Sequence, residues 1–481
     1  ASMEELASDL EAWIDRRPIR ASAPSLGHAL RLFAERHRAA VLTAAAALLI
    51  LSLSAGGFVW SLADALREKD EARLDAELRR DVLAVGALAA REPLDLWPAT
   101  PERAPVMEGW LAELDSILRR RSDAKARART IEPERADATE TEALEAGLAR
   151  LAVLRPAVEQ RLQSARSLRQ TSCIDASARW SECLADLRNS AQFLGLDLEL
   201  MEGLIPLRKS ATSGLWEFAH LQSGSVPALD GDRVVTTEDS GIVLVLLPGA
   251  VYELGRPNPD GKTPAAEHQR TVSIAPFLVA AHEVTQAQWM RVMGGNPSRD
   301  RPGVHVGIPA TLMHPVETVA WNRAIECARR LSLRLPTMAE WEYAARAAGS
   351  NVYGYGMDLD SLEGHENVRD TTWGWGAGNT AAWEDPYRCT SPVGSFASNA
   401  LGLFDMLGNV AEWCADRFEQ VEPVAFGTPE AGTCAFRGGS WYQPPVACRP
   451  TMLQFNGPDE ANLTNGLRLA RSVDPGARER R

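Results

Sequence analysis

The most uniform hydrophobic pattern in the chain is a run of 25 residues, from Ala39 to Ala63, that contains no charged side chain. At 1.5 Å of rise per residue, a helix of this length crosses a hydrocarbon core about 30 Å thick. A buried helix of a globular core is the alternative, but such helices rarely continue this far without a charge. The pattern therefore predicts one transmembrane helix over residues 39–63.

The charges that flank this run differ between its two ends. The N-terminal flank carries Arg31, Arg36, His37 and Arg38 against one Glu35, whereas the charges after residue 63 are balanced. By the positive-inside rule the N-terminus is cytoplasmic and the chain after about residue 64 lies outside. In a bacterium this describes a single-pass protein of the inner membrane, most of which lies in an oxidising, calcium-accessible compartment.

Helical periodicity continues on both sides of the membrane segment. Apolar residues at helical spacing in the first 14 positions predict an amphipathic helix within a cytoplasmic juxtamembrane segment, residues 1–38. Residues 64–210 are rich in Ala, Leu, Arg and Glu and predict a helical stalk. Cys173 and Cys183 lie in this stalk, either as a local disulfide or as two buried free thiols.

The pattern changes after residue 210. An apolar run, "GIVLVLLPGAVYELG", is interrupted by Pro248 and Gly249, and nine of the 14 tryptophans follow Leu215. Strand-like runs, many glycines and few helical patterns predict an α+β domain with long loops over residues 211–474. Residues 475–481 are expected to form a disordered tail.

Charge and cysteine content narrow the classes of function. The 51 basic and 64 acidic residues give a net charge of -13, which argues against a nucleic-acid surface and suits metal cations or a non-anionic ligand. Seven cysteines leave at least one thiol unpaired, and no His/Cys cluster has zinc spacing. The sequence does not fix the oligomeric state.

Several blocks in the last domain carry a family resemblance. "HEVTQAQWMRVM" (282–293) predicts a helix capped by Thr285, and Thr337 with Glu340 forms a capping box inside a second block, residues 314–349. With "DMLGNVAEW", "RGGSWYQPPVACRP" and "NGLRLARS", these blocks resemble the formylglycine-generating enzymes, or sulfatase-modifying factors. The resemblance spans residues 242–472 and implies a C-type-lectin-like fold.

The first 20 residues resemble the segment that precedes the membrane span of bacterial Ser/Thr kinases. The match includes an Arg-Pro-x-x-Ala pattern, "RPIRA", but the chain contains no kinase glycine loop, lysine motif or catalytic loop. The resemblance implies that the chain is the C-terminal piece of a receptor-like kinase and carries no kinase chemistry itself.

Copper chemistry is the first activity that the enzyme family implies. Catalytic members bind Cu(I) through two cysteines five residues apart, the first of them three residues after the Ser of the Gly-Gly-Ser motif. Here the Ser is Ser440, and the two positions hold Gln443 and Cys448. An amide is a poor substitute for a soft thiolate, so the sequence argues against copper catalysis. Cys448 is then expected to be structural, either buried beside Arg449 or bridged to Cys414 or Cys434.

Calcium is the metal that remains. The family carries two loop sites built from hard oxygen ligands, and both map onto this chain. The residues of the first are Asn367, the Val368 carbonyl, Asp385 and the Tyr387 carbonyl. The residues of the second are Asp405, the Gly408 and Val410 carbonyls, and Glu412. Loop hydrogen bonding without metal is the alternative.

Non-catalytic relatives suggest a ligand-binding role. They include extracytoplasmic kinase domains and the variable proteins of diversity-generating retroelements, which vary residues between a Gly-Gly-Ser-Trp block and a Gly-Phe-Arg-like block. Here the interval from Gly438 to Arg468 is expected to display Trp441, Tyr442, Gln443, Pro445, Phe455, Asn456 and Asn462 to a protein or peptide. A catalytically inactive sensor domain is the primary hypothesis. A copper-dependent oxidase of sulfatase cysteines and a structural envelope protein are the alternatives.

Overall fold

The computed structural model describes residues 2–17, 26–128, 138–194, 196–257, 267–304, 309–347, 349, 351–371, 380–418 and 432–473. The chain divides into two compact units. The first comprises Ala1–Gly86 and Ile117–Leu148, and the second comprises Ala87–Ser116 and Ala149–Arg481. The expected tail at 475–481 lies outside the described residues.

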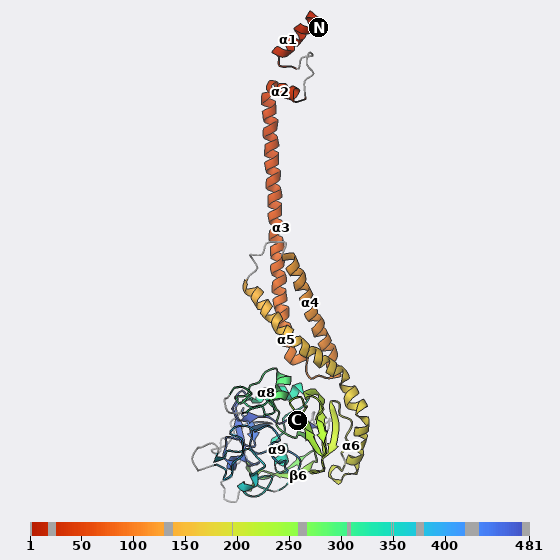
Figure 1. Cartoon of the computed structure of the whole chain (residues 1–481), viewed down its shortest axis with the longest axis vertical. Coiled ribbons are helices and arrows are strands. Elements are labelled where there is room, and N and C mark those ends of the chain that lie inside the picture. Colours follow the sequence, from red (N-terminus) through yellow and green to blue (C-terminus); the bar gives the residue numbers. More distant parts are fainter. Residues whose placement is uncertain are drawn as a thin grey trace. The chain divides into compact units, whose positions relative to one another are not determined.

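The N-terminal part of the chain is helical, as its periodicity predicts (Figure 1). A capping box between Ser2 and Glu5 starts the first helix, all of whose described apolar side chains are solvent-accessible. The helices are α1 (Met3–Ile14), α2 (Leu26–Arg36), α3 (Arg38–Asp95), α4 (Ala104–Ala128) and α5 (Ala138–Arg169).

Helix α3 is longer than the membrane segment that it contains. Its 58 residues run without a break through the expected span of 39–63 and on to Asp95. One window of α3 reaches a mean hydropathy of 2.1, with none of that window buried. The helix is therefore long and apolar enough to cross a membrane, and the same helix continues as the first part of the stalk.

The second unit begins with helical elements and enters a sheet earlier than expected. A π-helical turn η2 (Gln170–Asp175), helix α6 (Ser177–Asn189) and a short η3 (Ala191–Phe193) lead to strand β1 (Leu204–Lys209). Strand β1 pairs antiparallel with β2 (Trp216–His220), with Leu204 opposite His220. The expected boundary at residue 211 is therefore too late, because the apolar residues of β1 are buried against its partner strand.

Two main sheets organise the C-terminal domain. The larger has the order β1-β2-β5-β8-β13 and is antiparallel throughout. Strand β5 is buried along its whole length, which explains why its sequence is an uninterrupted apolar run. The smaller has the order β11-β10-β9-β12. The strands not yet defined are β5 (Val243–Leu247), β8 (Phe277–Ala280), β9 (Ala411–Arg417), β10 (Cys434–Arg437), β11 (Gln454–Asn456), β12 (Asn465–Gly466) and β13 (Ala470–Ser472).

Two hairpins and three helices complete the described part of this domain. Capping boxes at Thr285 and Thr337 start α7 and α9, as the sequence predicts, and Gly294 ends α7 at a φ of 80°. The elements are β3 (Ala228–Asp230) with β4 (Arg233–Val235), β6 (Ala250–Leu254) with β7 (Arg270–Ile274), α7 (Gln286–Met293), α8 (Trp321–Arg330), α9 (Met338–Ala345) and the 3-10 turns η1 (Pro101–Arg103), η4 (Leu221–Ser223), η6 (Leu359–Leu362) and η8 (Pro445–Cys448).

All seven cysteines are free, and all but Cys173 are buried. Neither the Cys173–Cys183 bridge nor a bridge from Cys448 to Cys414 or Cys434 is formed. The alternative of free thiols describes the structure in both cases, although Cys173 is only half-buried.

Candidate functional site

The turn after strand β10 is built around two glycines. Gly438 and Gly439 have φ angles of 96° and 70°, in the region that side chains with a Cβ rarely adopt. A Cβ on Gly439 would lie 2.5 Å from the Sγ of Cys448. The second glycine therefore allows Cys448 to pack directly against the backbone of the turn.

Cys448 is enclosed by this packing. Its side chain is fully buried at the end of η8, and its Sγ lies 3.9 Å from the Pro444 carbonyl oxygen. Burial raises the pKa of the thiol to about 12. The sulfur is therefore a neutral thiol at physiological pH, and a neutral thiol is neither a good nucleophile nor a good copper ligand.

Gln443 occupies the position at which the first catalytic cysteine is expected. Its Nε2 donates to Oε1 of Gln454 at 2.9 Å, and Nε2 of Gln454 lies 3.4 Å from Oε1 of Gln443. The backbone carbonyl of Gln443 accepts from the Arg369 N–H at 3.2 Å. The residue thus ties the turn to strand β11 through an amide pair.

The expected ligand-binding residues divide into exposed and buried sets. Tyr442 is 41% exposed, Asn462 is exposed, and Gln443, Phe455 and Asn456 are half-buried. The Phe455 ring packs partly against the hydrophobic core of the domain. Trp441 and Pro445 are buried, so the prediction that these two are displayed to a ligand is wrong. The Trp441 N–H donates to the Asn409 carbonyl at 3.1 Å, which holds the residue inward beneath Tyr442. We call Tyr442, Gln443, Phe455, Asn456 and Asn462 the amide-aromatic face.

The residues expected at the first calcium site contain two unsatisfied oxygens. Nδ2 of Asn367 donates to the Cys389 carbonyl at 2.8 Å, and Oδ1 of Asp385 accepts from the Tyr387 N–H at 2.8 Å. Asn367 Oδ1 and Asp385 Oδ2 are buried and have no hydrogen-bond partner among the described residues. Burial raises the pKa of Asp385 to about 7. Val368, which follows Asn367 in the sequence, is also buried. Buried hard oxygens without a hydrogen-bond partner fit a calcium ion.

The residues expected at the second calcium site are differently arranged. Glu412 is fully buried, and its carboxylate accepts from Nη2 of Arg468 at 2.7 Å and from Nε1 of Trp341 at 2.6 Å. Arg468 already supplies the positive charge that a cation would bring. Asp405 keeps one buried oxygen, Oδ1, without a partner in the described chain, while its Oδ2 accepts from the Gly394 N–H at 2.6 Å.

The loop of the second site contacts the first. Gly408, at a φ of 121°, lies directly against the backbone carbonyl of Asn367, which leaves no room for a Cβ. The Val410 N–H donates to Oε1 of Glu283 at 3.0 Å. Burial, with the neighbouring Asp405 and Glu412 charges, raises the pKa of Glu283 well above its ordinary value. The structure therefore brings both sets together, but only the first set has unpaired oxygens on two of its side chains.

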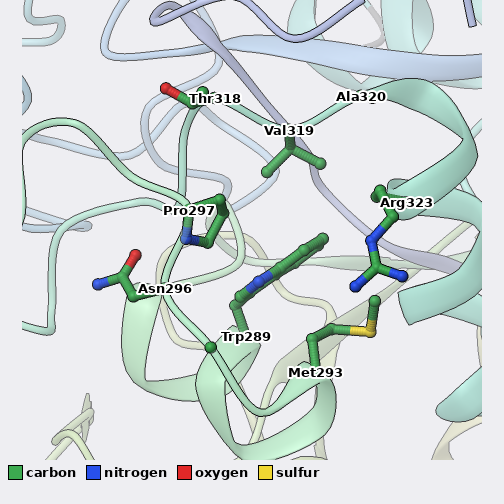
Figure 2. Close-up of a pocket in the computed structure, with 9 residues that line it drawn as sticks. Trp289, Met293, Asn296, Pro297, Thr318, Val319, Ala320 and Arg323 are labelled. Atoms are coloured by element: carbon green, nitrogen blue, oxygen red, sulfur yellow. The ribbon is translucent and has the colours of Figure 1, made fainter. Parts of the chain in front are cut away.

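A groove of about 290 Å³ lies between helix α7 and the N-terminal end of helix α8. Figure 2 shows the Trp289 indole and the Met293 thioether on the side of α7, with the Arg323 guanidinium near Met293. The lining residues are Trp289, Met293, Gly295, Asn296, Pro297, Thr318, Val319, Ala320 and Arg323. The Thr318 N–H donates to the Asn462 carbonyl at 3.2 Å, so the groove adjoins one residue of the amide-aromatic face.

This groove is not among the sites that the sequence predicts. The available signal was the spacing of Trp289 and Met293, which at four residues apart share one face of a helix. The contribution of residues 295–297 and 318–320 depends on the path of two loops, which local sequence does not encode.

Residues 233–473, half of the chain, match the family model described as the sulfatase-modifying factor enzyme 1-like domain. The chain belongs to this family. Its C-terminal domain has the α+β, C-type-lectin-like fold of formylglycine-generating enzymes, and a long apolar helix precedes it.

Relatives of this sulfatase-modifying factor family member include an enzyme and a kinase. The formylglycine-generating enzyme of Thermomonospora curvata is 29% identical over 48% of this chain and 93% of its own length. The serine/threonine-protein kinase Pkn1 of Chlamydia trachomatis serovar L2 is 29% identical over 42% of this chain, but the match spans only 34% of the kinase. Among solved structures, Treponema denticola variable protein 1 is 22% identical, with a TM-score of 0.39, over 48% of this chain and 96% of its own.

Proposed function

We propose that this family member is the extracytoplasmic, catalytically inactive sensor domain of a membrane-anchored, kinase-associated receptor. The observation that supports this proposal most directly is the amide pair of Gln443 and Gln454 at the position expected for the first catalytic thiol. Two-coordinate Cu(I) needs two soft thiolates. In this chain one position holds an amide, and the other holds the buried, neutral thiol of Cys448.

The amide-aromatic face is the proposed binding surface. It combines two aromatic rings with three amides, and such a mixture supplies rigid contact area together with adaptable hydrogen bonds. Trp441 and Pro445 are buried, and the Trp441 ring packs against the ring of Tyr442. A protein or peptide is the ligand that suits an open surface of this composition. Its residues lie in the interval that variable proteins diversify, so a diversified binding surface is part of the proposal.

The proposed arrangement places the kinase on the other side of the membrane. The similarity to Pkn1 and the kinase-like first 20 residues support a kinase association. The excess of basic residues before the apolar segment of α3 supports a cytoplasmic N-terminus in a bacterial inner membrane. Because α3 continues from that segment to Asp95, a single helix would connect the membrane span to the outer part of the chain.

Calcium is proposed as a structural ion at the first metal site. The ion would be held by Asn367 Oδ1, Asp385 Oδ2 and the carbonyls of Val368 and Tyr387. It would supply the positive partner that the two buried side-chain oxygens lack among the described residues. The ion would fix the loops that carry Asp385 and Tyr387. Glu412 and Arg468 neutralise each other, so a second calcium ion at that position is not part of the proposal.

A selection of binding peptides tests the sensor function. A random peptide library is selected on the full chain in nanodiscs. Peptides that recognise the amide-aromatic face are expected to lose affinity by about tenfold with Tyr442→Ala, because aromatic side chains dominate such contacts. Val251→Ala, at a 79% exposed residue of strand β6, is the matched control. Selected peptides that bind all variants equally would contradict the proposed surface.

The oxidase alternative has its own assay. The purified full chain is incubated with Cu(I), oxygen and a cysteine peptide derived from a sulfatase, and peptide mass is followed. We expect no conversion to formylglycine. Turnover that Cys448→Ala abolishes would overturn the inactive-sensor proposal.

A further inference from the structure

Trp97 is an unusual member of the domain core because it comes from the segment after helix α3. Its side chain is 7% exposed and packs in the same hydrophobic cluster as the strands of the larger sheet. Two guanidinium groups lie over its indole ring, that of Arg161 at 3.7 Å and that of Arg330 at 5.6 Å from the ring centre. Partly desolvated cation–π contacts of this kind stabilise the position of the ring.

Each guanidinium is held by an acidic residue. Arg161 Nη1 donates to Oε1 of Glu92 at 3.0 Å, and both side chains are only about a tenth exposed. Arg330 Nη2 donates to Oε1 of Glu326 at 2.5 Å, while its Nη1 donates to the Val292 carbonyl at 2.8 Å. Glu92 lies in α3, Arg161 in α5, Val292 in α7 and Arg330 in α8. Helices α5 and α8 therefore each place a guanidinium over the indole ring, and groups of α3 and α7 hold those two guanidiniums.

Glu326 connects this junction to the groove of Figure 2. Its second oxygen, Oε2, forms an ion pair with Arg323, and Arg323 lines the groove. One carboxylate is thus shared between Arg323 at the groove and Arg330 over Trp97. The side chain of Arg323 is 53% exposed and that of Arg330 only 10%. Solvent and ligands therefore reach the first arginine but not the second.

We propose that Arg330, Trp97, Arg161 and Glu92 form a latch between the ligand-binding domain and the end of α3, and that a negatively charged ligand group bound at Arg323 in the groove tightens it. This inference rests on the proposed sensor function and adds to it a second contact point and a route of coupling. The suitable ligand class carries an apolar group for Trp289 and Met293 next to a carboxylate or another anion for Arg323.

The direction of the effect follows from electrostatics. Arg323 and Arg330 are both cations on the same carboxylate, so the repulsion between them offsets part of the attraction that holds each to Glu326. A ligand anion at Arg323 neutralises one of these two cations, so the ion pair between Glu326 and Arg330 becomes stronger. Removal of the Arg323 charge by mutation should likewise tighten the latch, whereas removal of the Glu326 charge should loosen it.

Hydrogen exchange measured on the full chain in nanodiscs tests the latch without any ligand. The readout is amide exchange between Ala87 and Asp95, at the end of α3. Arg323→Gln is expected to slow exchange there by about two- to fivefold, and Glu326→Gln to accelerate it by a similar factor, the range of a partly exposed ion pair. Arg329→Gln, at an exposed arginine on the same helix, is the control and should change nothing.

Opposite changes in exchange rate for Arg323→Gln and Glu326→Gln distinguish coupling through the latch from a general loss of stability. Both substitutions remove the pair between Arg323 and Glu326 within α8, so a merely structural role would loosen α8 and α3 in both variants. Equal signs, or no change at Ala87–Asp95, would overturn the latch. Trp97→Leu keeps an apolar side chain at this position but removes the ring face, and it is expected to abolish the difference between the two variants.

The ligand half of the proposal is tested with 4-phenylbutyrate against its neutral alcohol, 4-phenylbutanol. Only the anion should slow exchange at Ala87–Asp95, and Arg323→Gln should remove that response. If both compounds change the exchange rate equally, or the anion does not change it, the anionic-ligand part is overturned. The exchange rates of the Arg323→Gln and Glu326→Gln variants still test the latch. Peptide binding at the amide-aromatic face is measured separately, so failure of the sensor proposal is distinguishable from failure of the latch.

Discussion

The first of the two proposed calcium sites leads to a quantitative prediction about pH and calcium. Asp385 is 7% exposed, its Oδ2 has no partner among the described residues, and burial raises its pKa to about 7. A carboxyl whose pKa is higher in the folded state binds protons more tightly in the native chain. Its contribution is therefore most favourable at low pH and is lost as pH rises from about 4 to about 7.

The size of this loss can be derived from the two pKa values. A change from the ordinary 3.8 to about 7 corresponds to at most about 4 kcal/mol once the group is ionised. Partial solvation of the carboxylate reduces this to roughly 2 kcal/mol. In a domain of this size, about 2 kcal/mol lowers the melting temperature by about 4–8 °C. Calcium bound only to the native state should recover a similar amount, about 2.7 kcal/mol at a hundredfold excess over Kd.

The assay is thermal unfolding of the full chain at pH 5 and pH 8, each with calcium or with EGTA. Other buried acids titrate in this range, so the quantity of interest is the difference between the wild-type chain and Asp385→Asn. The variant should lose both the pH-dependent drop in EGTA and the gain from calcium, whereas Asp459→Asn, at an exposed residue, should retain both. A wild-type melting temperature that ignores EGTA, or a pH profile unchanged by Asp385→Asn, would refute the reasoning.

Three further predictions concern the turn and the buried ion pair. Cys448 should resist a thiol reagent such as DTNB in the native chain and react on unfolding, because its thiol is buried with a pKa of about 12; rapid native-state labelling would contradict the packing against Gly439. Gly439→Ala should lower the urea midpoint and destabilise the domain by about 2 kcal/mol or more, because the new residue has a strained positive φ and its Cβ meets Cys448. Addition of Cys448→Ala should recover only the part of this loss that comes from the contact with Cys448. Arg468→Gln should cost about 3–5 kcal/mol because it leaves Glu412 buried without a counter-charge, and the addition of Glu412→Gln should recover part of it; additive losses would show that the pair is not coupled.

Local signals in the sequence were sufficient for much of the fold. The uncharged run identified a membrane-length segment of α3, and the capping residues Thr285 and Thr337 marked two helix starts that the structure reproduces. These features depend on residues a few positions apart. The family blocks added the long-range order of the domain, because their combined resemblance carries the fold with it.

Contacts between distant segments were not predictable in the same way. Trp97 was assigned to a stalk, yet it packs in the core of the C-terminal domain and contacts Arg330, which lies far away in sequence. Trp441 was expected on the surface because aromatic residues favour interfaces, but its side chain is buried and its backbone N–H donates to the Asn409 carbonyl. Neither outcome follows from periodicity, since both depend on where the chain returns in three dimensions.

The structural role of Arg468 differs from the role that its sequence motif suggests. The block that contains it was used to delimit a binding region, and Glu412, 56 residues earlier, was assigned to calcium. In the structure Arg468 donates to Glu412 and to the carbonyls of Ala280 and Phe404, so it joins three separate segments around one charge. A side-chain cation held in this way is always present, whereas occupancy by a calcium ion depends on the calcium concentration. Because Arg468 already neutralises Glu412, we expect any calcium dependence to arise at the first of the two proposed sites, which contains Asp385.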